Sequence, residues 1–408
     1  MADRTVVLIG TLDTKGQELQ FLRDRLRSAG VVPLVVDVGT LGPPRLVADI
    51  TREQVAAAGG VDLTALANAG DRGRAVAAMG VAAAQLIHRL FDEGRCQGIL
   101  AAGGSGNTAI ATQAMQALPV GIPKLMVSTM AAGDVRDYVG TSDITMMASV
   151  TDVAGVNSIS ARILANAAAA MAGMVAAPPV GAGPARPTVA ATMFGVTTAS
   201  VTAARGELEA HGYEVITFHA TGTGGRAMEK LIRSGLVSAV LDVTTTELAD
   251  ELVGGVLTAG PDRLEAAGRA GIPQVVSLGA LDMVNFGAPE SVPQQFRHRV
   301  LHAHNPTVTL MRTTAQECAE LGRRIGEKLS AATGRVAVFV PLGGVSALSV
   351  PGGAFHDPAA DEALFDAVRR HLRPPAELIE IDTHINDPAF AHAMAAKLAE
   401  YLEDEDER

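Results

Sequence analysis

Ala101-Ala102-Gly103-Gly104-Ser105-Gly106-Asn107-Thr108 joins a predicted strand, Gly98–Ala102, to a predicted helix, Asn107–Leu118. Glycine lacks a Cβ, so the backbone here can turn tightly and lie close to a ligand. The free N–H groups and the positive dipole end of the following helix favour an anion, most naturally a phosphate. No Gly-Lys-Ser/Thr follows, so the segment is not a Walker A loop. The alternative interpretation is an ordinary strand-to-helix turn, capped by a polar side chain, that binds nothing.

Short apolar runs alternate with helix-length segments on both sides of this loop. In the first half, strands are predicted at Thr5–Ile9, Val32–Val36, Ile99–Ala102 and Leu125–Ser128, and helices near Lys15–Ser28, Gly73–Glu93 and Asn107–Leu118. In the second half, strands are predicted at Thr188–Met193, Glu214–Phe218, Val237–Asp242, Gln274–Leu278, Val336–Val340 and Leu378–Ile381, and helices near Ser200–His211, Gly225–Ser234, Asp262–Ala270, Ala315–Ala331, Asp361–Leu372 and Pro388–Leu402. The alternation predicts βαβ units, and therefore an α/β fold with doubly wound parallel sheets.

A segment rich in proline and glycine, Ala177-Pro178-Pro179-Val180-Gly181-Ala182-Gly183-Pro184, cannot continue a helix and marks a boundary. We therefore predict an N-terminal lobe over residues 1–177, a linker over 178–187 and a C-terminal lobe over 188–408. Both lobes are expected to be Rossmann-like, with a cleft between them. Leu8-Ile9-Gly10-Thr11 resembles Met193-Phe194-Gly195-Val196, which either an internal duplication or shared turn chemistry would explain.

The composition of the 408-residue chain excludes several classes of protein. Its hydrophobic fraction of 48% is too high for a disordered chain. A net charge of −11 and an aromatic fraction of 3% disfavour nucleic-acid binding. The two cysteines form no disulfide framework, and no signal peptide is visible. Polar residues and prolines interrupt the apolar stretch Ile159–Val180, so no membrane span is predicted. We expect a soluble, cytoplasmic protein.

Other loops of the first half carry hydroxyl, amide and charged groups suited to a nucleotide. After the first strand, Thr11 and Lys15 suit phosphate, and Asp13 suits a ribose hydroxyl or Mg²⁺. Each such loop alone could be a helix cap, but ligands of open α/β sheets bind at the carboxyl ends of strands, where we expect these loops to meet. The predicted nucleotide-binding residues are Thr11, Asp13, Lys15, Gly103, Gly104, Ser105, Gly106, Asn107, Thr108, Ser128, Thr129, Gly140, Thr141 and Asp143.

The second half has its own polar segments. The glycine-rich segment His219–Arg226 follows a strand and opens a helix. His302 and His304 alternate along an extended segment, so both can face one side. With His384, Asp282 or His219 they could bind a metal or supply acid–base catalysis. Most such pairs are surface or hydrogen-bonded histidines, and the metal question stays open. The predicted catalytic residues are Arg226, Asp282, His302, His304, Arg312 and His384.

These motifs, in this order, resemble the largely uncharacterised family that shares the N-terminal ATP-binding domain of the tomato mosaic virus resistance protein. The resemblance covers nearly the whole chain, least clearly Gly39–Gly70. It rests on Gly10–Lys15, Gly103–Thr108, Gly121–Lys124, Gly140–Asp143, Thr192–Thr198, Phe218–Met228, Asp242–Glu247, Ser277–Gly287, His302–Asn305, Met311–Thr314, Gly343–Leu348 and His384–Asp387. It implies ATP bound to the first lobe, a second similar lobe and a homodimer. One departure is Asn107, at a position where relatives often have a further glycine.

Three hypotheses of function follow. The first is a non-P-loop ATP-binding protein, with Mg²⁺ as a further candidate cofactor, which holds the phosphates on Gly103–Thr108 and a second small molecule in the C-terminal lobe. The second is an ATP-dependent or metal-assisted enzyme that acts on a small organic acid in the interlobe cleft. The third is an inhibitor that works through protein contacts alone, which the scarcity of aromatic residues disfavours. Whether the protein is an enzyme is left open.

Overall fold

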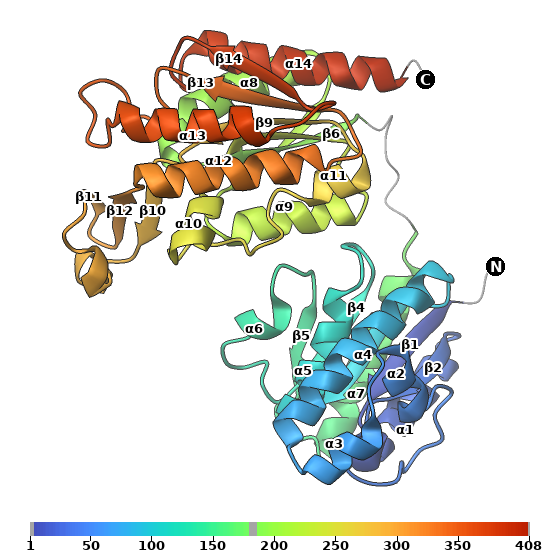
Figure 1. Ribbon diagram of the computed structural model, residues 1–408. Helices are drawn as coiled ribbons and strands as arrows, with labels where there is room; N and C mark the ends of the chain where they lie inside the picture. The colour runs from blue at the N-terminus through green and yellow to red at the C-terminus, as the bar shows by residue number, and fades with distance from the viewer. Residues whose placement is uncertain (1–3, 179–185, 407–408) are drawn as a thin grey trace. The chain divides into compact units, whose positions relative to one another are not determined.

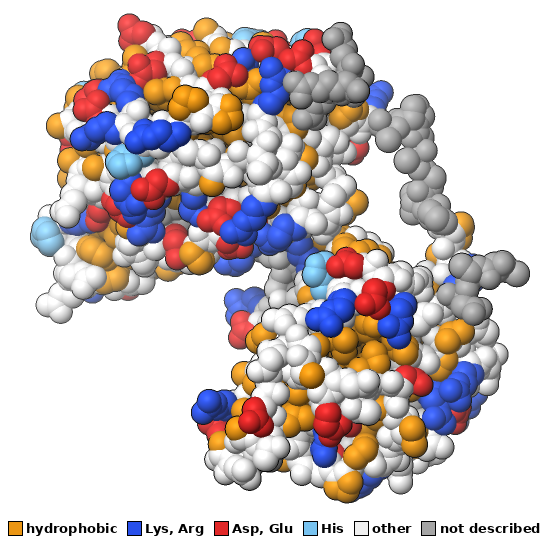
Figure 2. All heavy atoms as spheres, turned by 45° about the vertical axis from the view of Figure 1, so that its right-hand side comes forward, with side chains coloured by type: hydrophobic (Ala, Val, Ile, Leu, Met, Phe, Trp, Pro, Cys, Tyr) orange, Lys and Arg blue, Asp and Glu red, His pale blue; other side chains and the backbone are white. Residues whose placement is uncertain are grey.

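The computed structural model describes residues 4–178 and 186–406, and its contacts divide the chain into two compact units, residues 1–181 and 182–408. Each unit is a parallel sheet flanked by helices (Figure 1), which confirms the predicted fold of two Rossmann-like lobes. The predicted linker, 178–187, falls mostly outside the described residues. On the face drawn in Figure 2, acidic and basic side chains are interspersed over both units.

The first unit contains five parallel strands in the order β2-β1-β3-β4-β5. The strands are β1 (Thr5–Gly10), β2 (Val32–Asp37), β3 (Gly98–Gly103), β4 (Lys124–Ser128) and β5 (Thr145–Ala148). The helices are α1 (Leu12–Ser28), α2 (Arg52–Ala58), α3 (Leu63–Ala69), α4 (Arg72–Asp92), α5 (Ser105–Gln116), α6 (Arg136–Val139) and α7 (Ser158–Ala176). Four of these strands match the predicted ones to within one residue at each end, whereas β5 was not predicted.

Alternate residues of β1 point to opposite faces of this sheet, as strand geometry requires. Val7 and Ile9 pack with the apolar sides of α4 and α5, and Val6 and Leu8 pack with those of α1 and α7. Because both faces are covered by helices, the strands read as continuous apolar runs in the sequence. Helix packing thus holds the carboxyl ends of the strands, and the loops that follow them, in fixed positions.

Helix α7 is the one described helix that is long and apolar enough to cross a membrane by length and composition. Its residues Leu164, Ala168 and Met171 are buried in the same apolar cluster as β1 and α1. The buried side of α7 is therefore part of the core of the first unit.

The second unit repeats the strand order of the first and adds one strand. Its parallel sheet has the order β7-β6-β8-β9-β13-β14, so the second strand in the chain again lies outside the first. The strands are β6 (Thr188–Met193), β7 (Glu214–His219), β8 (Ala239–Thr244), β9 (Gln274–Gly279), β13 (Val336–Pro341) and β14 (Glu377–Ile381). The helices are α8 (Thr198–Ala210), α9 (Thr223–Arg233), α10 (Glu247–Val253), α11 (Ala266–Ala270), α12 (Ala315–Ser330), α13 (Pro358–His371) and α14 (Pro388–Asp406).

A small antiparallel sheet lies between β9 and α12 in the chain, and it was not predicted. Its strands, in the order β10-β12-β11, are β10 (Met283–Phe286), β12 (Val308–Arg312) and β11 (Leu301–Asn305). One edge strand, β11, is largely exposed, and its pattern lacks the apolar run that marked the other strands. The predicted extended segment with His302 and His304 is this edge strand.

Candidate functional site

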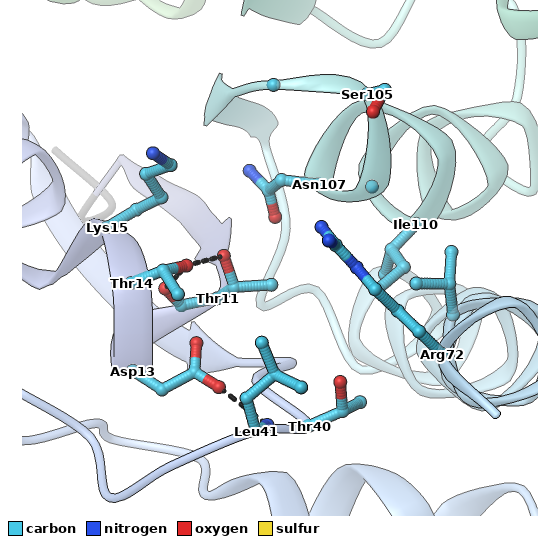
Figure 3. Close-up of a pocket in the computed structure, with 13 residues that line it drawn as sticks. Thr11, Asp13, Thr14, Lys15, Thr40, Leu41, Arg72, Ser105, Asn107 and Ile110 are labelled. Atoms are coloured by element: carbon cyan, nitrogen blue, oxygen red, sulfur yellow. Dashed lines mark hydrogen bonds between the residues drawn. The ribbon is translucent and has the colours of Figure 1, made fainter. Parts of the chain in front are cut away.

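The first unit has a cavity where its strand order reverses. The chain passes from β1 outward to β2 and then returns to β3 on the other side of β1, so the loops after β1 and β3 leave in opposite directions. Such a reversal opens a crevice at the carboxyl edge of the sheet. A cavity of about 210 Å³ lies there, shown in Figure 3. It is lined by Thr11, Asp13, Thr14, Lys15, Thr40, Leu41, Arg72, Val76, Gly104, Ser105, Gly106, Asn107 and Ile110.

The amino terminus of α5 opens onto this cavity. Gly104 occupies the N-cap position, so the helix has no side-chain cap there. A Cβ placed on Gly104 would lie 3.8 Å from its nearest neighbour, and one on Gly106 would lie 3.6 Å from the Arg72 guanidinium. A Cβ would therefore make only ordinary van der Waals contacts at both glycines. The first N–H groups of a helix have no partner within the helix, so here they are available to a ligand.

Asn107 lies in the first turn of α5, and its side chain bonds to β3 rather than capping the helix. Its side-chain nitrogen donates to the carbonyl of Ala102, at 2.9 Å, and ties the helix back to the end of β3. Its Oδ1 atom is buried and has no hydrogen-bond partner. Gly103 is required beside it, because a Cβ there would lie 2.7 Å from the Asn107 Cβ. Asn107 thus fixes the bend and leaves one acceptor unused.

The start of α1 forms the opposite wall. Thr11 and Thr14 share a hydrogen bond of 2.8 Å between their hydroxyls. The Oδ2 atom of Asp13 accepts from the backbone N–H groups of Leu41, at 2.8 Å, and Gly42, at 3.2 Å, while its Oδ1 atom is buried without a partner. Lys15 donates to the carbonyl of Val153. The wall therefore carries hydroxyls, a carboxylate and an ammonium group.

Three lining residues come from a part of the chain that the sequence interpretation did not use. Thr40 and Leu41 follow β2 in the segment Gly39–Gly70, which has no clear periodicity. Arg72 is the first residue of α4, and Figure 3 shows its guanidinium pointing into the cavity. A cation at the start of a helix is unfavourable for the helix dipole, and that mismatch is the signal that could have identified Arg72.

Three other predicted nucleotide-binding residues, Thr108, Ser128 and Thr129, lie near the cavity without lining it. Ser128, at the end of β4, is buried and shares a hydrogen bond of 2.7 Å with the hydroxyl of Thr108. The hydroxyl of Thr129 lies 3.8 Å from where a Cβ of Gly104 would stand. The hydrogen bond between Ser128 and Thr108 thus ties the start of α5 to the end of β4, and Thr129 lies next to Gly104.

Gly140, Thr141 and Asp143 do not join this site, contrary to expectation. They precede β5 and so lie at the amino edge of the parallel sheet, opposite the cavity. Asp143 accepts from Lys124, the first residue of β4, at 2.7 Å. The prediction was wrong because β5 was not recognised, so the loop before it was taken for a loop after a strand.

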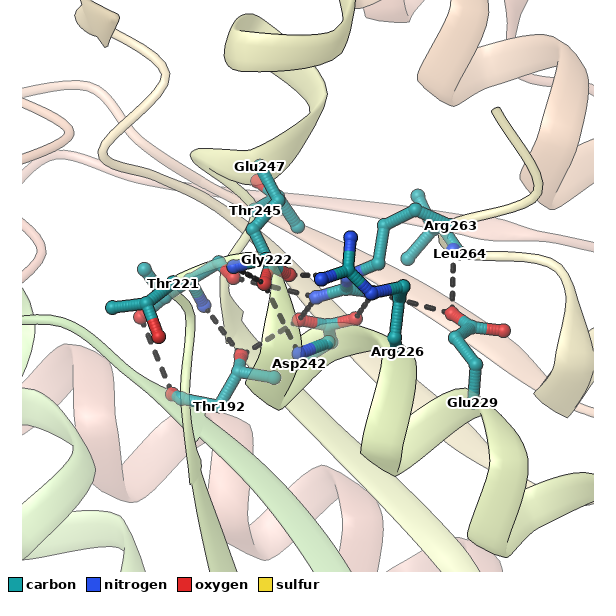
Figure 4. Close-up of polar contacts among 12 residues, drawn as sticks. Thr192, Thr221, Gly222, Arg226, Glu229, Asp242, Thr245, Glu247, Arg263 and Leu264 are labelled. Atoms are coloured by element: carbon teal, nitrogen blue, oxygen red, sulfur yellow. Dashed lines mark hydrogen bonds and ion pairs between the residues drawn. The ribbon is translucent and has the colours of Figure 1, made fainter. Parts of the chain in front are cut away.

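The predicted glycine-rich segment of the second unit follows β7, the counterpart of β2, and a side chain of the protein itself fills it, as Figure 4 shows. One carboxylate oxygen of Glu247 accepts from the N–H groups of Gly222, at 2.6 Å, and Gly225, at 3.0 Å, at the start of α9. Its other oxygen accepts from the buried Arg263 at 2.7 Å. Arg226 is exposed and donates to the carbonyl of Thr258. A carboxylate therefore occupies the place that a phosphate would take.

Arg263 is the centre of a buried ion cluster at the end of β8. Besides Glu247, it contacts Asp242, at 2.5 and 2.8 Å, and Glu229, at 3.4 Å. Burial lowers the pKa of Arg263, but the three carboxylates outweigh it and hold that pKa above its ordinary value. Burial raises the pKa of Glu229 in spite of this partner. The cluster joins β8, α9 and α10 and leaves no space for a ligand among these side chains.

Most of the remaining predicted catalytic residues also contact protein groups. Asp282 is fully buried and accepts from Ser346 at 2.7 Å, and burial raises its pKa to about 6. Arg312 donates to Asp361 at 2.5 Å and to the carbonyl of Phe355 at 2.8 Å. These contacts hold the antiparallel sheet against α13.

The histidines do not converge on one point. The His302 ring packs edge-on against Phe355, with 6.1 Å between ring centroids, and His304 is exposed. His384 lies after β14, and its Nδ1 atom is buried without a partner. Within residues 4–178 and 186–406, no group of three or more His, Cys, Asp or Glu residues could hold a metal ion.

Comparison with known proteins assigns the family. Residues 4–179 match the N-terminal domain of the uncharacterised protein family UPF0261, and residues 186–402 match its C-terminal domain. A UPF0261 protein of Clostridium tetani is 50% identical over 402 residues, which cover 98% of this chain and 100% of that protein. One from Rhizobium meliloti is 51% identical over 395 residues, which cover 96% and 98%.

A plant protein shares the same sequence pattern. The tomato ToMV resistance protein Tm-1 is 40% identical over 417 residues, which cover 97% of this chain and 55% of the tomato protein. This match confirms the resemblance that the motifs predicted. The chain therefore belongs to the uncharacterised protein family UPF0261.

Proposed function

We propose that the first unit binds a nucleotide, with ATP as the first candidate, through phosphates placed at the amino terminus of α5. The observation that carries this proposal is the uncapped start of α5, which opens onto a cavity of about 210 Å³ at the reversal of the strand order. Ligands of open α/β sheets bind at such points, and helix amino termini bind anions.

The charges around the cavity suit this ligand. Lys15 and Arg72 line it on two sides, and both can neutralise phosphate charge. Thr11 and Ser105 add hydroxyl groups that donate to phosphate oxygens. If Mg²⁺ accompanies the nucleotide, Asp13 is the one carboxylate among the lining residues that could hold it.

The rest of the proposal concerns the second unit and assembly. The family resemblance supports a homodimer. The composition favours a cytoplasmic location, and the polar segments of the second unit favour a second small molecule there. An ATP-dependent enzyme that acts on a small organic acid has less support, because Asp282 and Arg312 are engaged with protein partners. In the second unit, Glu247 already fills the loop that would otherwise receive an anion.

Gly104→Asp tests the nucleotide proposal. Aspartate is favoured at the position before a helix, and the site has room for a side chain, so this variant should fold. Its carboxylate would occupy the amide groups of α5, as Glu247 does at α9. We expect ATP to bind the unchanged protein in a calorimetric titration, and Gly104→Asp to weaken that binding by about 100-fold or more.

Gly195→Asp is the matched control. Gly195 follows β6, the counterpart of β1, and a Cβ there meets nothing within 4 Å. This variant should bind ATP like the unchanged protein. Titrations with ADP, GTP and NAD would define the preferred nucleotide. If no nucleotide binds, or if Gly104→Asp binds ATP normally, the proposed site is wrong.

A further inference from the structure

Two buried oxygen atoms at the cavity lack a hydrogen-bond partner. They are Oδ1 of Asp13, whose side chain belongs to a residue 5% exposed, and Oδ1 of Asn107, in a residue 4% exposed. Both residues line the cavity, and Figure 3 shows them on facing walls, from α1 and α5. A buried acceptor without a donor costs free energy, and such atoms are rare in native proteins. Their presence at one cavity therefore indicates that the ligand supplies hydrogen-bond donors.

Phosphate groups alone do not satisfy these two atoms. Phosphate oxygens accept hydrogen bonds, and the carboxylate of Asp13 and the carbonyl of Asn107 also only accept. The N–H groups at the start of α5 are donors, and they suit the phosphates. The cavity thus presents N–H donors at the start of α5 and unsatisfied acceptors on both α5 and α1, so its ligand needs an anionic end and a part that donates.

The donor is more readily a hydroxyl group than a cation. Asp13 is the one carboxylate among the lining residues, and Lys15 and Arg72 bring two positive charges to the same cavity. The second oxygen of Asp13 already accepts from Leu41 and Gly42, which leaves one oxygen for the ligand. Asp13 and Asn107 each offer one fixed acceptor oxygen, and a hydroxyl group donates one proton, so two hydroxyls would satisfy both atoms.

We infer that Asp13 and Asn107 recognise the ribose hydroxyls of the nucleotide, so that the site selects ribonucleotides over deoxyribonucleotides. This inference rests on the proposed function and adds a specificity to it. Asp13 is held rigidly for this role, because two backbone amides fix its carboxylate and Gly39 packs against it. A site built around a hydroxyl rejects the analogue that lacks it, since its own polar group then stays unpaired.

Calorimetric titrations with ATP, 2′-deoxy-ATP, 3′-deoxy-ATP and inorganic tripolyphosphate test this specificity on the full chain. We expect at least one deoxynucleotide, and tripolyphosphate, to bind about 10- to 100-fold more weakly than ATP. Asp13→Asn keeps the shape of the side chain but replaces one carboxylate oxygen with an amide NH₂ group, which must face either Leu41 or the ligand. In this variant the discrimination against the deoxynucleotide that lacks the hydroxyl facing Asp13 should fall to about twofold or less, while the hydroxyl facing Asn107 should still be recognised. Asp24→Asn, at an exposed position of the same helix, should change neither affinity nor discrimination.

The outcomes separate this inference from the proposal beneath it. If ATP binds and both deoxynucleotides bind equally well, the inference is wrong and the nucleotide site stands. If ATP binding requires Mg²⁺, disappears in EDTA and ignores the ribose hydroxyls, a cation satisfies Asp13 and the inference is again wrong. If Asp13→Asn discriminates against both deoxynucleotides as strongly as the unchanged protein does, Asp13 does not contact the ribose and the inference is wrong. If no nucleotide binds at all, both the proposed nucleotide site and the proposed ribose specificity are wrong.

Discussion

Asp250 is a buried carboxyl group whose titration should make stability depend on pH. It accepts from the backbone and side-chain nitrogens of Asn285, at 3.0 and 2.7 Å, but burial outweighs these bonds and raises its pKa to about 7. The folded chain then keeps a proton that the unfolded chain, with an ordinary pKa of 3.8, releases. The free energy of unfolding should therefore fall as pH rises from about 4 to about 7, by at most about 1.4 kcal/mol per pH unit. Urea unfolding of the unchanged protein and Asp250→Asn checks this, because the variant should lose this contribution.

Asp143 gives the opposite sign and serves as the comparison. Partial burial raises its pKa, but hydrogen bonds from Lys124 and the amide of Gly121 outweigh that effect and lower it below 3.8. Its ion pair therefore contributes stability above about pH 4, which is lost as pH falls through the lowered pKa. Asp143→Asn should destabilise the protein at neutral pH and have less effect in acid. Equal pH profiles for Asp143→Asn and Asp250→Asn would contradict both assignments.

Single residues of the candidate site were predictable only where they follow a recognised strand. Thr11 and Asn107 were identified because a strand, a glycine and a helix mark their positions in the sequence. Arg72 and Leu41 reach the cavity from segments whose place in the fold depends on tertiary packing. The one local signal was the cation at the start of α4, and the unsatisfied oxygen of Asp13 became visible only with the whole pocket.

At the scale of elements, two glycines in consecutive helices of the second unit should respond in opposite ways to substitution by alanine. A Cβ on Gly225, in α9, would overlap the Glu247 carboxylate, which Arg263 and two amides hold in place. Gly225→Ala should therefore lower the free energy of unfolding by about 3 kcal/mol, the scale for breaking a buried ion pair. Gly206, in α8, is exposed, and a Cβ there would meet no atom within 4 Å. Gly206→Ala should therefore raise the free energy of unfolding by about 1 kcal/mol. Urea unfolding measures both, and a stabilised Gly225→Ala would show that Glu247 can move.

The same ion cluster explains why one helix begins later than the sequence predicts. The apolar pattern favours a helix near Asp262–Ala270, but α11 covers only Ala266–Ala270. Arg263 turns inward to Asp242, and Leu264 adopts a positive φ of 76° while its N–H donates to Glu229. A buried charge network thus overrides helix propensity. Propensity is local, whereas the partners of Arg263 come from three other elements.

At the scale of the whole molecule, the alternation of strands and helices was sufficient to predict two α/β units. Strands buried on both faces produce apolar runs that stand out against amphipathic helices, and β1, β3 and β8 are of this kind. The strands that were missed, β5 and the antiparallel sheet, are short, partly exposed or inserted between repeats. Strand order is not a property of any one segment, so the coincidence of cavity and strand reversal required the assembled sheet.

Because each unit has its own sheet and its own apolar clusters, we expect the full chain to unfold in two calorimetric transitions. Gly206→Ala identifies the transition of the second unit, since it should raise only that melting temperature. ATP at about 100 times its dissociation constant should stabilise the other transition by about 2.7 kcal/mol. Gly104→Asp should abolish the ATP effect and leave the second unit unchanged. If ATP instead shifts the transition that Gly206→Ala identifies, the nucleotide site belongs to the second unit, where Glu247 would have to leave the amide groups of α9.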